Sequence, residues 1–291
     1  MQAPDSGLEP RDMPASRLNR MSEAPIGLIA GSKSLPLLFA REARKRGQRL
    51  VAVAFEGETD PSIASVVDDV VWLRVGQLGK MIQSLVQRDV RQCVMLGQIA
   101  PKNLFDLRPD LRAMAILFKL KEKNAHTIFG AIADELARDG ITLVPAVPWL
   151  QPWMPTGGYR CGPALSRELE EDVGYGLRIA RETSRLEIGQ CVVVKRGTVL
   201  AVEAFEGTDE CLERGGRLAG KDGAAVAVKV AKPGHDFRFD IPCIGPMTLA
   251  VCARSGVEVL AVESDRTLLL DLEQLESEAR RLKVSVVTTG P

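Results

Sequence analysis

The chain has 291 residues, of which 45% are apolar and 26% are charged, a composition typical of a globular protein with more than one domain. Lys plus Arg and Asp plus Glu number 38 each, and aromatic residues make up 4%, so neither a basic field nor stacking platforms for nucleic acid are expected. Six cysteines without a CxxC pair, beside two histidines, disfavour a zinc site and indicate the reduced thiols of a cytosolic protein.

Residues 1–24 lack the apolar core of a secretory signal, and we expect them to form a disordered tail. From Ile26 onward, apolar strand runs alternate with amphipathic helices. The expected strands are residues 26–31, 49–55, 70–75, 92–97 and 141–145, and the expected helices are residues 35–47, 78–89, 111–122 and 127–138. Continuous apolar strands separated by helices predict a mainly parallel sheet covered on both faces. Residues 25–150 are therefore expected to form a Rossmann-like N-terminal domain.

Residues 151–163 are rich in Pro, Trp and Gly and are expected to link this domain to a second one. Residues 164–291 are expected to form a catalytic α/β domain with a mixed sheet. It opens with a long helix, and a hairpin follows with its turn at Arg196–Gly197. The remaining expected strands are 224–230, 257–262, 266–270 and 284–289, and the remaining helices begin near 208, near 246 and after Asp271, which with Gln274 forms a capping box.

The stretch "GLIAGSKSLP", residues 27–36, places a glycine turn between a buried strand and a helix. Free backbone N–H groups at Gly31 and Ser32 could hold a phosphate at the helix start. The alternative is a tight turn with Ser34 as the helix cap, because neither a GxGxxG motif nor a phosphate-binding P-loop motif occurs here. Residue spacing alone does not decide between the two interpretations.

The stretch "VEAFEGTDE", residues 202–210, gathers carboxylates where a strand is expected to give way to a helix. Ligand sites in α/β folds lie at such junctions. Helix capping by Thr208 would account for Asp209 and the acid that follows it, but not for Glu203, which we expect inside the apolar strand. We therefore favour a functional role for this stretch.

The stretch "KVAKPGHDFRFDIPCIGP", residues 229–246, carries two lysines followed by Asp236, Arg238 and Asp240 at alternate positions. If this segment is extended, those three side chains share one face. Carboxylates beside basic groups suit a phosphate that is held through a divalent metal. A solvated ladder of ion pairs is the alternative, and the flanking phenylalanines favour one buried face instead.

These stretches, together with "LEIGQCVVVKRG", "VGQLGKMI" and "VLAVES", resemble the UDP-2,3-diacylglucosamine pyrophosphatases of lipid A biosynthesis that are unrelated to the calcineurin-like phosphoesterases. The resemblance runs from Ile26 onward. It implies hydrolysis of a phosphoanhydride to UMP and 2,3-diacylglucosamine 1-phosphate, a divalent metal (Mg²⁺ or Mn²⁺), and a site between two domains joined by a hinge. The essential aspartate of the family's "D.P.IG" block falls on Asp240, whereas His235 and Cys243 depart from the family pattern.

The expected site residues combine the resemblance with the three stretches. The expected catalytic residues are Asp240, Arg238 and Lys232; the substrate-binding residues are Gly31, Ser32, Lys229, Gln190 and Thr208; and the metal ligands are Asp240, Asp209, Glu203 and Glu206.

The resemblance also implies a cytoplasmic enzyme that contacts the inner membrane surface transiently to collect its glycolipid substrate, with homodimer formation left open. Two other classes of function stay open. A non-catalytic sensor of a nucleotide sugar or a lipid-linked metabolite would bind its ligand without turnover or metal. A nicotinamide-dependent reductase would use the Gly31 turn and Glu56, and the missing GxGxxG motif makes it the least favoured interpretation.

Overall fold

The computed structural model describes residues 24–99, 109–120, 125–232, 234 and 236–290, and the expected disordered tail therefore lies almost entirely outside the described residues. The chain divides into two compact units, Met1–Ala146 and Val147–Pro291. Residues 151–163, the expected linker, belong to the second unit. They contribute a short strand to its sheet, because Arg160 and Cys161 pair with the last strand of the chain.

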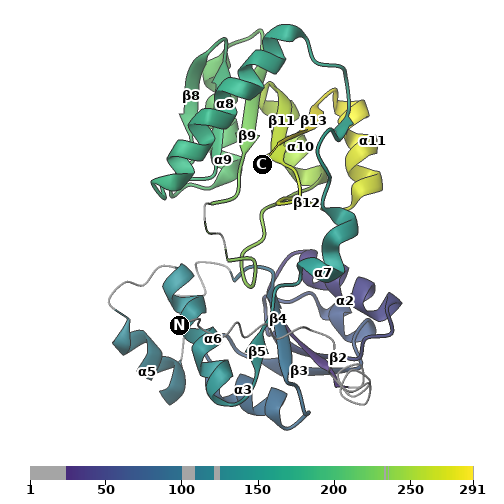
Figure 1. Ribbon diagram of the computed structural model, residues 1–291, viewed down its shortest axis with the longest axis vertical. Helices are drawn as coiled ribbons and strands as arrows, with labels where there is room; N and C mark the ends of the chain where they lie inside the picture. The colour runs from purple at the N-terminus through teal and green to yellow at the C-terminus, as the bar shows by residue number, and fades with distance from the viewer. Residues whose placement is uncertain (1–23, 100–108, 121–124, 233, 235, 291) are drawn as a thin grey trace, which may run out of the picture. The chain divides into compact units, whose positions relative to one another are not determined.

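The N-terminal unit is built on a parallel sheet of five strands in the order β3-β2-β1-β4-β5. Its strands are β1 (Ile26–Ala30), β2 (Leu50–Phe55), β3 (Asp69–Leu73), β4 (Gln92–Leu96) and β5 (Thr142–Leu143). Its helical segments are α2 (Leu35–Lys45), η1 (Pro61–Ser65), α3 (Leu78–Val86), α5 (Leu111–Lys119) and α6 (Ala125–Arg138). In Figure 1, α2 lies on one side of this sheet and α3, α5 and α6 lie on the other.

The central strands of this sheet are fully buried, which explains their uninterrupted apolar sequence. Every residue of β1 and β2 is buried. The strand order reverses direction between β1 and β4, and such a switch point is where open α/β sheets bind ligands. This arrangement confirms the predicted Rossmann-like sheet.

The C-terminal unit contains a mixed sheet of six strands in the order β6-β13-β11-β9-β7-β8, and a two-stranded sheet of β10 and β12. Its strands are β6 (Arg160–Cys161), β7 (Cys191–Lys195), β8 (Thr198–Val202), β9 (Ala225–Lys229), β10 (Cys243–Ile244), β11 (Val257–Glu263), β12 (Leu268–Leu269) and β13 (Ser285–Thr289). Its helical segments are α7 (Val147–Leu150), η2 (Gln151–Trp153), α8 (Arg167–Arg185), α9 (Thr208–Ala219), α10 (Pro246–Ser255) and α11 (Leu272–Leu282). Strands β9, β11 and β13 are parallel to one another, while β6, β7 and β8 each join an antiparallel pair.

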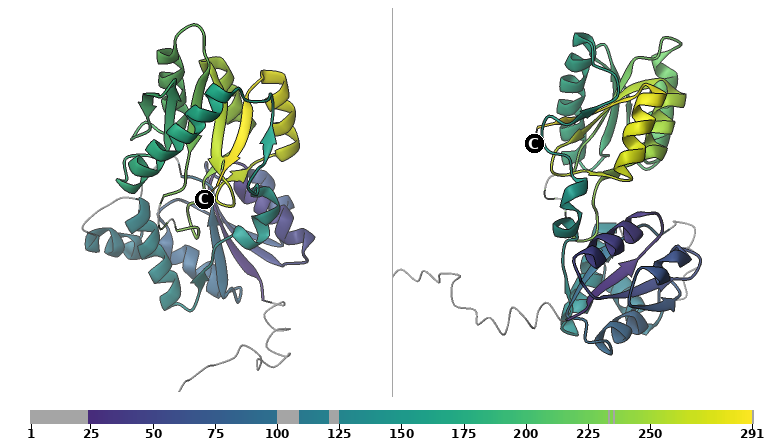
Figure 2. Two further views of the ribbon diagram at one scale, coloured as in Figure 1. Left: turned by 45° about the horizontal axis from the view of Figure 1, so that its top comes forward. Right: turned by 90° about the vertical axis from the view of Figure 1, so that its right-hand side faces the viewer.

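Helices cover both faces of the six-stranded sheet, so this unit has three layers (Figure 2). Helix α8 packs on one face, where Ala180 meets alternate valines such as Val192 and Val228. Helices α9, α10 and α11 pack on the other face, where Leu212 and Leu249 meet the intervening strand residues. Because successive residues of a strand point to opposite faces, the apolar runs supply both cores at once. The predicted α/β class with a mixed second sheet is confirmed.

Three local features of the C-terminal unit bear on the predictions. The hairpin turn at Arg196–Gly197 is confirmed, since β7 and β8 pair antiparallel on either side of it. Strand β8 ends at Val202, so the prediction that Glu203 lies inside the strand is wrong by one residue. The capping box at Asp271 is also wrong, because this residue adopts a left-handed backbone conformation (φ 50°) and its side chain makes no capping hydrogen bond.

All six cysteines are free thiols. Among the helices of the described residues, none combines the length and the apolar character needed to span a bilayer.

Candidate functional site

Three chain segments meet where β8 and β9 end and α9 begins. The backbone N–H of Val230, just after β9, donates to the carbonyl of Gln190, just before β7, at 2.9 Å. The N–H of Glu203, just after β8, donates to the carbonyl of Cys191 at 2.8 Å. Because β7 runs antiparallel to both neighbours, its first residues lie beside the last residues of β8 and β9. The sheet therefore brings Gln190, Glu203 and Lys229 to one edge.

Hydrogen bonds join three of the expected site residues at this edge. The Lys229 ammonium Nζ donates to Thr208 Oγ1 at 2.6 Å, and Thr208 Oγ1 donates to Glu203 Oε1 at 3.0 Å. The second carboxylate oxygen of Glu203, Oε2, is buried and has no hydrogen-bond partner among the described residues. All three side chains are partly buried. A cation and a carboxylate are thus held on the two sides of one hydroxyl group.

The thiols of the buried Cys191 and the partly buried Cys243 respond to the charges at this edge. The pKa of the Cys191 thiol is raised well above its ordinary value by a hydrogen bond with Cys211 and by burial. Burial also raises the pKa of the Cys243 thiol; the charge of Lys229 opposes this shift, and the charge of Asp240 adds to it. Lys229 and Asp240 therefore act electrostatically on the same thiol.

The segment after β9 is folded into a turn, so the prediction of an extended row with Asp236, Arg238 and Asp240 on one face is wrong. The N–H groups of Phe239 and Asp240 donate to the carbonyl of Asp236 at 3.3 and 3.2 Å. The Asp236 carboxylate accepts the N–H of Arg238 at 3.1 Å, the local hydrogen bond with which aspartate favours a turn over a strand. The same carboxylate receives Nε and Nη2 of Arg238 at 2.9 and 2.6 Å.

Asp240 follows this turn and is exposed. The basic group of Arg238 is committed to Asp236, and the two side chains form a charge pair that precedes Asp240. The carbonyl of Lys232 accepts Arg266 Nη2 at 3.2 Å. His235 lies outside the described residues.

Two supporting residues are absent from the predictions, Glu263 and Arg266. Glu263 ends β11 with its side chain buried, and its Oε2 accepts the N–H of Ala231 at 2.9 Å. The Arg266 guanidinium lies 5.8 Å from the ring centre of Phe237, in addition to its bond to Lys232. Together they hold the segment that follows β9. The sequence signal that could have identified Glu263 is a carboxylate at the end of the apolar run "VLAVE". An acid is rarely buried unless it has a partner, so a carboxylate in such a run indicates a specific role.

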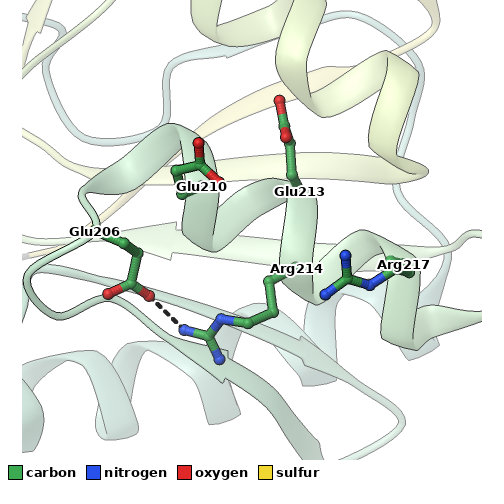
Figure 3. A pocket seen from close by; sticks show the side chains of 5 residues that line it. All are labelled: Glu206, Glu210, Glu213, Arg214 and Arg217. Atoms are coloured by element: carbon green, nitrogen blue, oxygen red, sulfur yellow. Dashed lines mark hydrogen bonds and ion pairs between the residues drawn. The ribbon is translucent and has the colours of Figure 1, made fainter.

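Glu206 and Asp209 face other surroundings. Figure 3 shows the pocket on the outer side of α9, where Glu206 turns towards Arg214. Their ion pair measures 2.5 Å, and the hydrogen bond from Arg214 is the main reason why the pKa of Glu206 is lowered. Asp209 is exposed, and its charge acts on Cys252 and Arg254 of α10. Within the described part of the chain, no three His, Cys, Asp or Glu side chains are grouped so that they could hold a metal ion.

In the N-terminal unit, the backbone N–H groups of the turn after β1 are hydrogen-bonded to the end of β4 and the residues that follow it. The N–H groups of Gly31 and Ser32 donate to the carbonyls of Leu96 and Gln98 at 2.8 and 2.7 Å, so the expectation that they are free for a phosphate is wrong. Ser32 Oγ also donates to the Gln98 carbonyl at 2.8 Å. A Cβ atom at Gly31 would lie 2.6 Å from that same carbonyl oxygen, which explains the glycine.

Family models match both halves of the chain. The model described as the LpxI N-terminal domain matches residues 25–153, and the model described as the LpxI C-terminal domain matches residues 157–287. UDP-2,3-diacylglucosamine pyrophosphatase LpxI of Caulobacter vibrioides (strain ATCC 19089 / CIP 103742 / CB 15) is 30% identical over 279 residues, which cover 91% of this chain and 98% of that protein.

Among solved structures, similarity extends to the biotin carboxylase domain of a thermophilic 2-oxoglutarate carboxylase, with a TM-score of 0.25, 16% identity, and coverage of 57% of this chain and 34% of that chain. For N5-carboxyaminoimidazole ribonucleotide synthetase from Thermotoga maritima the TM-score is 0.24 at 15% identity, with 63% of this chain and 42% of that chain covered. The chain spans less than half the length of these proteins, and a likeness at this level carries no argument about function.

Proposed function

The chain belongs to the LpxI family, and on that premise we propose that it hydrolyses the phosphoanhydride of UDP-2,3-diacylglucosamine to UMP and 2,3-diacylglucosamine 1-phosphate in lipid A biosynthesis. The observation that carries the proposal is the match of both halves to this family, with a pyrophosphatase relative aligned over 91% of the chain. The resemblance seen in the sequence motifs is thereby confirmed at the level of the family.

Lys229 is the basic residue whose surroundings best suit a phosphate. It ends a buried strand and is partly buried itself, so its charge is less screened than that of a surface lysine. The one hydrogen bond that its ammonium makes among the described residues goes to a neutral hydroxyl, that of Thr208. An ammonium has three donors, and the others can reach phosphate oxygens, where negative charge grows as the P–O bond breaks.

Asp240 is proposed to orient the attacking water. It follows the turn stabilised by Asp236 and acts electrostatically on Cys243, as does Lys229. An exposed carboxylate near a phosphate-binding cation can accept a hydrogen bond from water and hold it for attack on phosphorus. Lys232 is proposed to supply further positive charge beside it, and Gln190 and Thr208 to line the same edge. Arg238, paired with Asp236, is proposed to position the turn that precedes Asp240.

A divalent metal, Mg²⁺ or Mn²⁺, stays part of the proposal in a restricted form. The described residues do not by themselves assemble a three-ligand group, and Glu206 is paired with Arg214. Mg²⁺ in phosphoryl-transfer enzymes needs only one or two carboxylates when the substrate's phosphates supply other oxygens. Asp240 is the carboxylate proposed to serve in this way, since Glu203 is bonded to Thr208 and Asp209 acts on residues of α10. When bound, the ion would offset negative charge on the diphosphate.

We also propose that the protein works in the cytoplasm and touches the inner membrane surface while it collects its substrate, because two acyl chains keep that substrate in the bilayer. The supporting feature is the exposed apolar face of α5. Leu111, Met114 and Phe118 lie on one side of this helix, with exposed fractions of 84%, 38% and 83%. The exposed Lys119 at its end would favour anionic headgroups.

The test is incubation of the purified protein with UDP-2,3-diacylglucosamine and Mg²⁺, with UMP release as the readout. We expect UMP from the wild type and a loss of about 100-fold or more in kcat for Asp240→Ala, the range of a positioned acid–base group. Asp222→Ala, an exposed loop carboxylate, is the matched control and should keep full activity. Tight binding of the substrate without UMP release would contradict the proposal and favour a sensor, and loss of activity with EDTA would support the metal.

A further inference from the structure

Thr208 stands between two opposite charges that do not touch. Its hydroxyl oxygen lies 2.6 Å from Lys229 Nζ and 3.0 Å from Glu203 Oε1, and no direct ion pair joins Lys229 to Glu203 among the described residues. A hydroxyl has one hydrogen to donate. Since that hydrogen goes to Glu203, the oxygen is left to accept from Lys229.

The hydroxyl of Thr208 is not used for the ordinary purpose of a threonine at a helix start. Helix α9 begins at Thr208, with Gly207 at its N-cap and no side-chain capping hydrogen bond. Capping, the alternative explanation for this residue, therefore does not account for its side chain. What the hydroxyl does in this structure is connect the end of β9 to the residue after β8.

Glu203 shows why that connection matters. Its Oε2 is buried without a hydrogen-bond partner in the described part of the chain, and an unpartnered buried carboxylate oxygen is unfavourable. A cation, Lys229, is held at this edge on the other side of the Thr208 hydroxyl. Without the hydroxyl, a direct ion pair between the Lys229 ammonium and the Glu203 carboxylate would be favourable, and the ammonium would shift to form it.

We propose that Thr208 is a positioning residue: it separates Lys229 from Glu203, so that the ammonium stays at the end of β9 with its charge available to a substrate phosphate. This inference rests on the proposed function for the identity of the phosphate ligand, and on the structure alone for the separation. Glu203 orients the Thr208 hydroxyl, a role different from the metal binding expected from the sequence.

The test compares Thr208→Val, which removes the hydroxyl at nearly constant shape, with Thr208→Ser, which keeps it. The first readout is a crystal structure of Thr208→Val without ligand. We expect Lys229 Nζ to lie at about 2.7–2.9 Å from a Glu203 carboxylate oxygen, a direct ion pair. If the lysine stays at its present position, the spacer role is wrong, whatever the protein binds.

The second readout is calorimetric affinity for UDP, the diphosphate part of the proposed substrate, together with kcat. Thr208→Val should weaken UDP binding about tenfold or more, as expected for loss of a hydrogen bond to a charged group, while Thr208→Ser stays near wild type. Adding Glu203→Gln to Thr208→Val should recover much of the UDP affinity, because the amide cannot neutralise the ammonium. A merely structural role for Thr208 predicts no such recovery, and its absence would overturn the proposal.

Ser166→Ala serves as the stability control, since it removes a genuine N-cap hydrogen bond, from Leu169 to Ser166 of α8, in the same unit. It should lower the melting temperature without changing UDP affinity. If the wild type releases no UMP while Thr208→Val shows the direct ion pair, the proposed function fails and the spacer role stands. If UMP is released and no ion pair forms, the reverse holds.

Discussion

Asp172 closes a turn far from it in sequence. Its Oδ2 and Oδ1 accept the backbone N–H groups of Arg196 and Gly197 at 2.7 and 2.8 Å, and the residue is only 4% exposed. Both turn residues have positive φ, 48° and 67°, as a two-residue hairpin of the right twist requires. Position 196 holds arginine, for which a positive φ is unfavourable. The Asp172 carboxylate of α8 stabilises the turn in spite of this.

Replacement of this carboxylate should therefore cost stability. For Asp172→Ala we expect the free energy of unfolding to fall by about 2–3 kcal/mol, the range for hydrogen bonds to a buried charged acceptor. The neighbouring Glu171→Ala removes only an exposed ion pair with Arg167 and should change it by less than about 0.5 kcal/mol. Urea denaturation of both variants measures the difference. Equal losses would show that the carboxylate does not stabilise the hairpin.

Helix α9 carries two adjacent glycines, Gly215 and Gly216, because its neighbours pack too closely there for larger side chains. A Cβ at Gly215 would overlap the side chain of Val193 on β7, and a Cβ at Gly216 would overlap the carbonyl oxygen of Ser255 at the end of α10. The pair therefore lets α9 approach the sheet and α10 at once. Glycine costs helix stability of about 1 kcal/mol relative to alanine, and the close packing offsets this cost.

This packing predicts that two glycine substitutions change the free energy of unfolding in opposite directions. Gly216→Ala should lower the free energy of unfolding by about 1–3 kcal/mol, because the added methyl group forces α9 away from α10. Gly174→Ala, in the exposed middle of α8 where no atom approaches, should raise it by up to about 1 kcal/mol. Denaturant midpoints with unchanged slopes give both values. A Gly216→Ala protein as stable as the wild type would contradict this account of the packing.

At the scale of elements, the sequence predicts those helices and strands that local residue patterns determine. The apolar runs and amphipathic repeats identify the main strands and helices, since burial on both sides of a sheet requires continuous apolar character. The turn after β9 is missed because alternate charges also fit a strand; what decides is the Asp236 carboxylate, which bonds to the nearby N–H of Arg238. The capping box at Asp271 fails because the backbone there is left-handed.

At the scale of the whole molecule, two sheet edges compete as the place where a nucleotide diphosphate binds. The N-terminal sheet has its switch point between β1 and β4, but the N–H groups of Gly31 and Ser32 are used there by β4. The C-terminal sheet gathers Lys229, Thr208 and Glu203 at one edge. Residue types in the motifs indicate a phosphate chemistry, but which of them share hydrogen bonds depends on strand order, and strand order is set by contacts remote in sequence.

The measurement that tests this account most directly is a crystal structure of the protein soaked with UMP and Mn²⁺. We predict a phosphate oxygen of UMP within hydrogen-bond distance, about 2.7–3.2 Å, of Lys229 Nζ, with Thr208 still between Lys229 and Glu203. The account would be contradicted by UMP bound with its phosphate at the ends of β1 and β4 and with no phosphate oxygen in contact with Lys229.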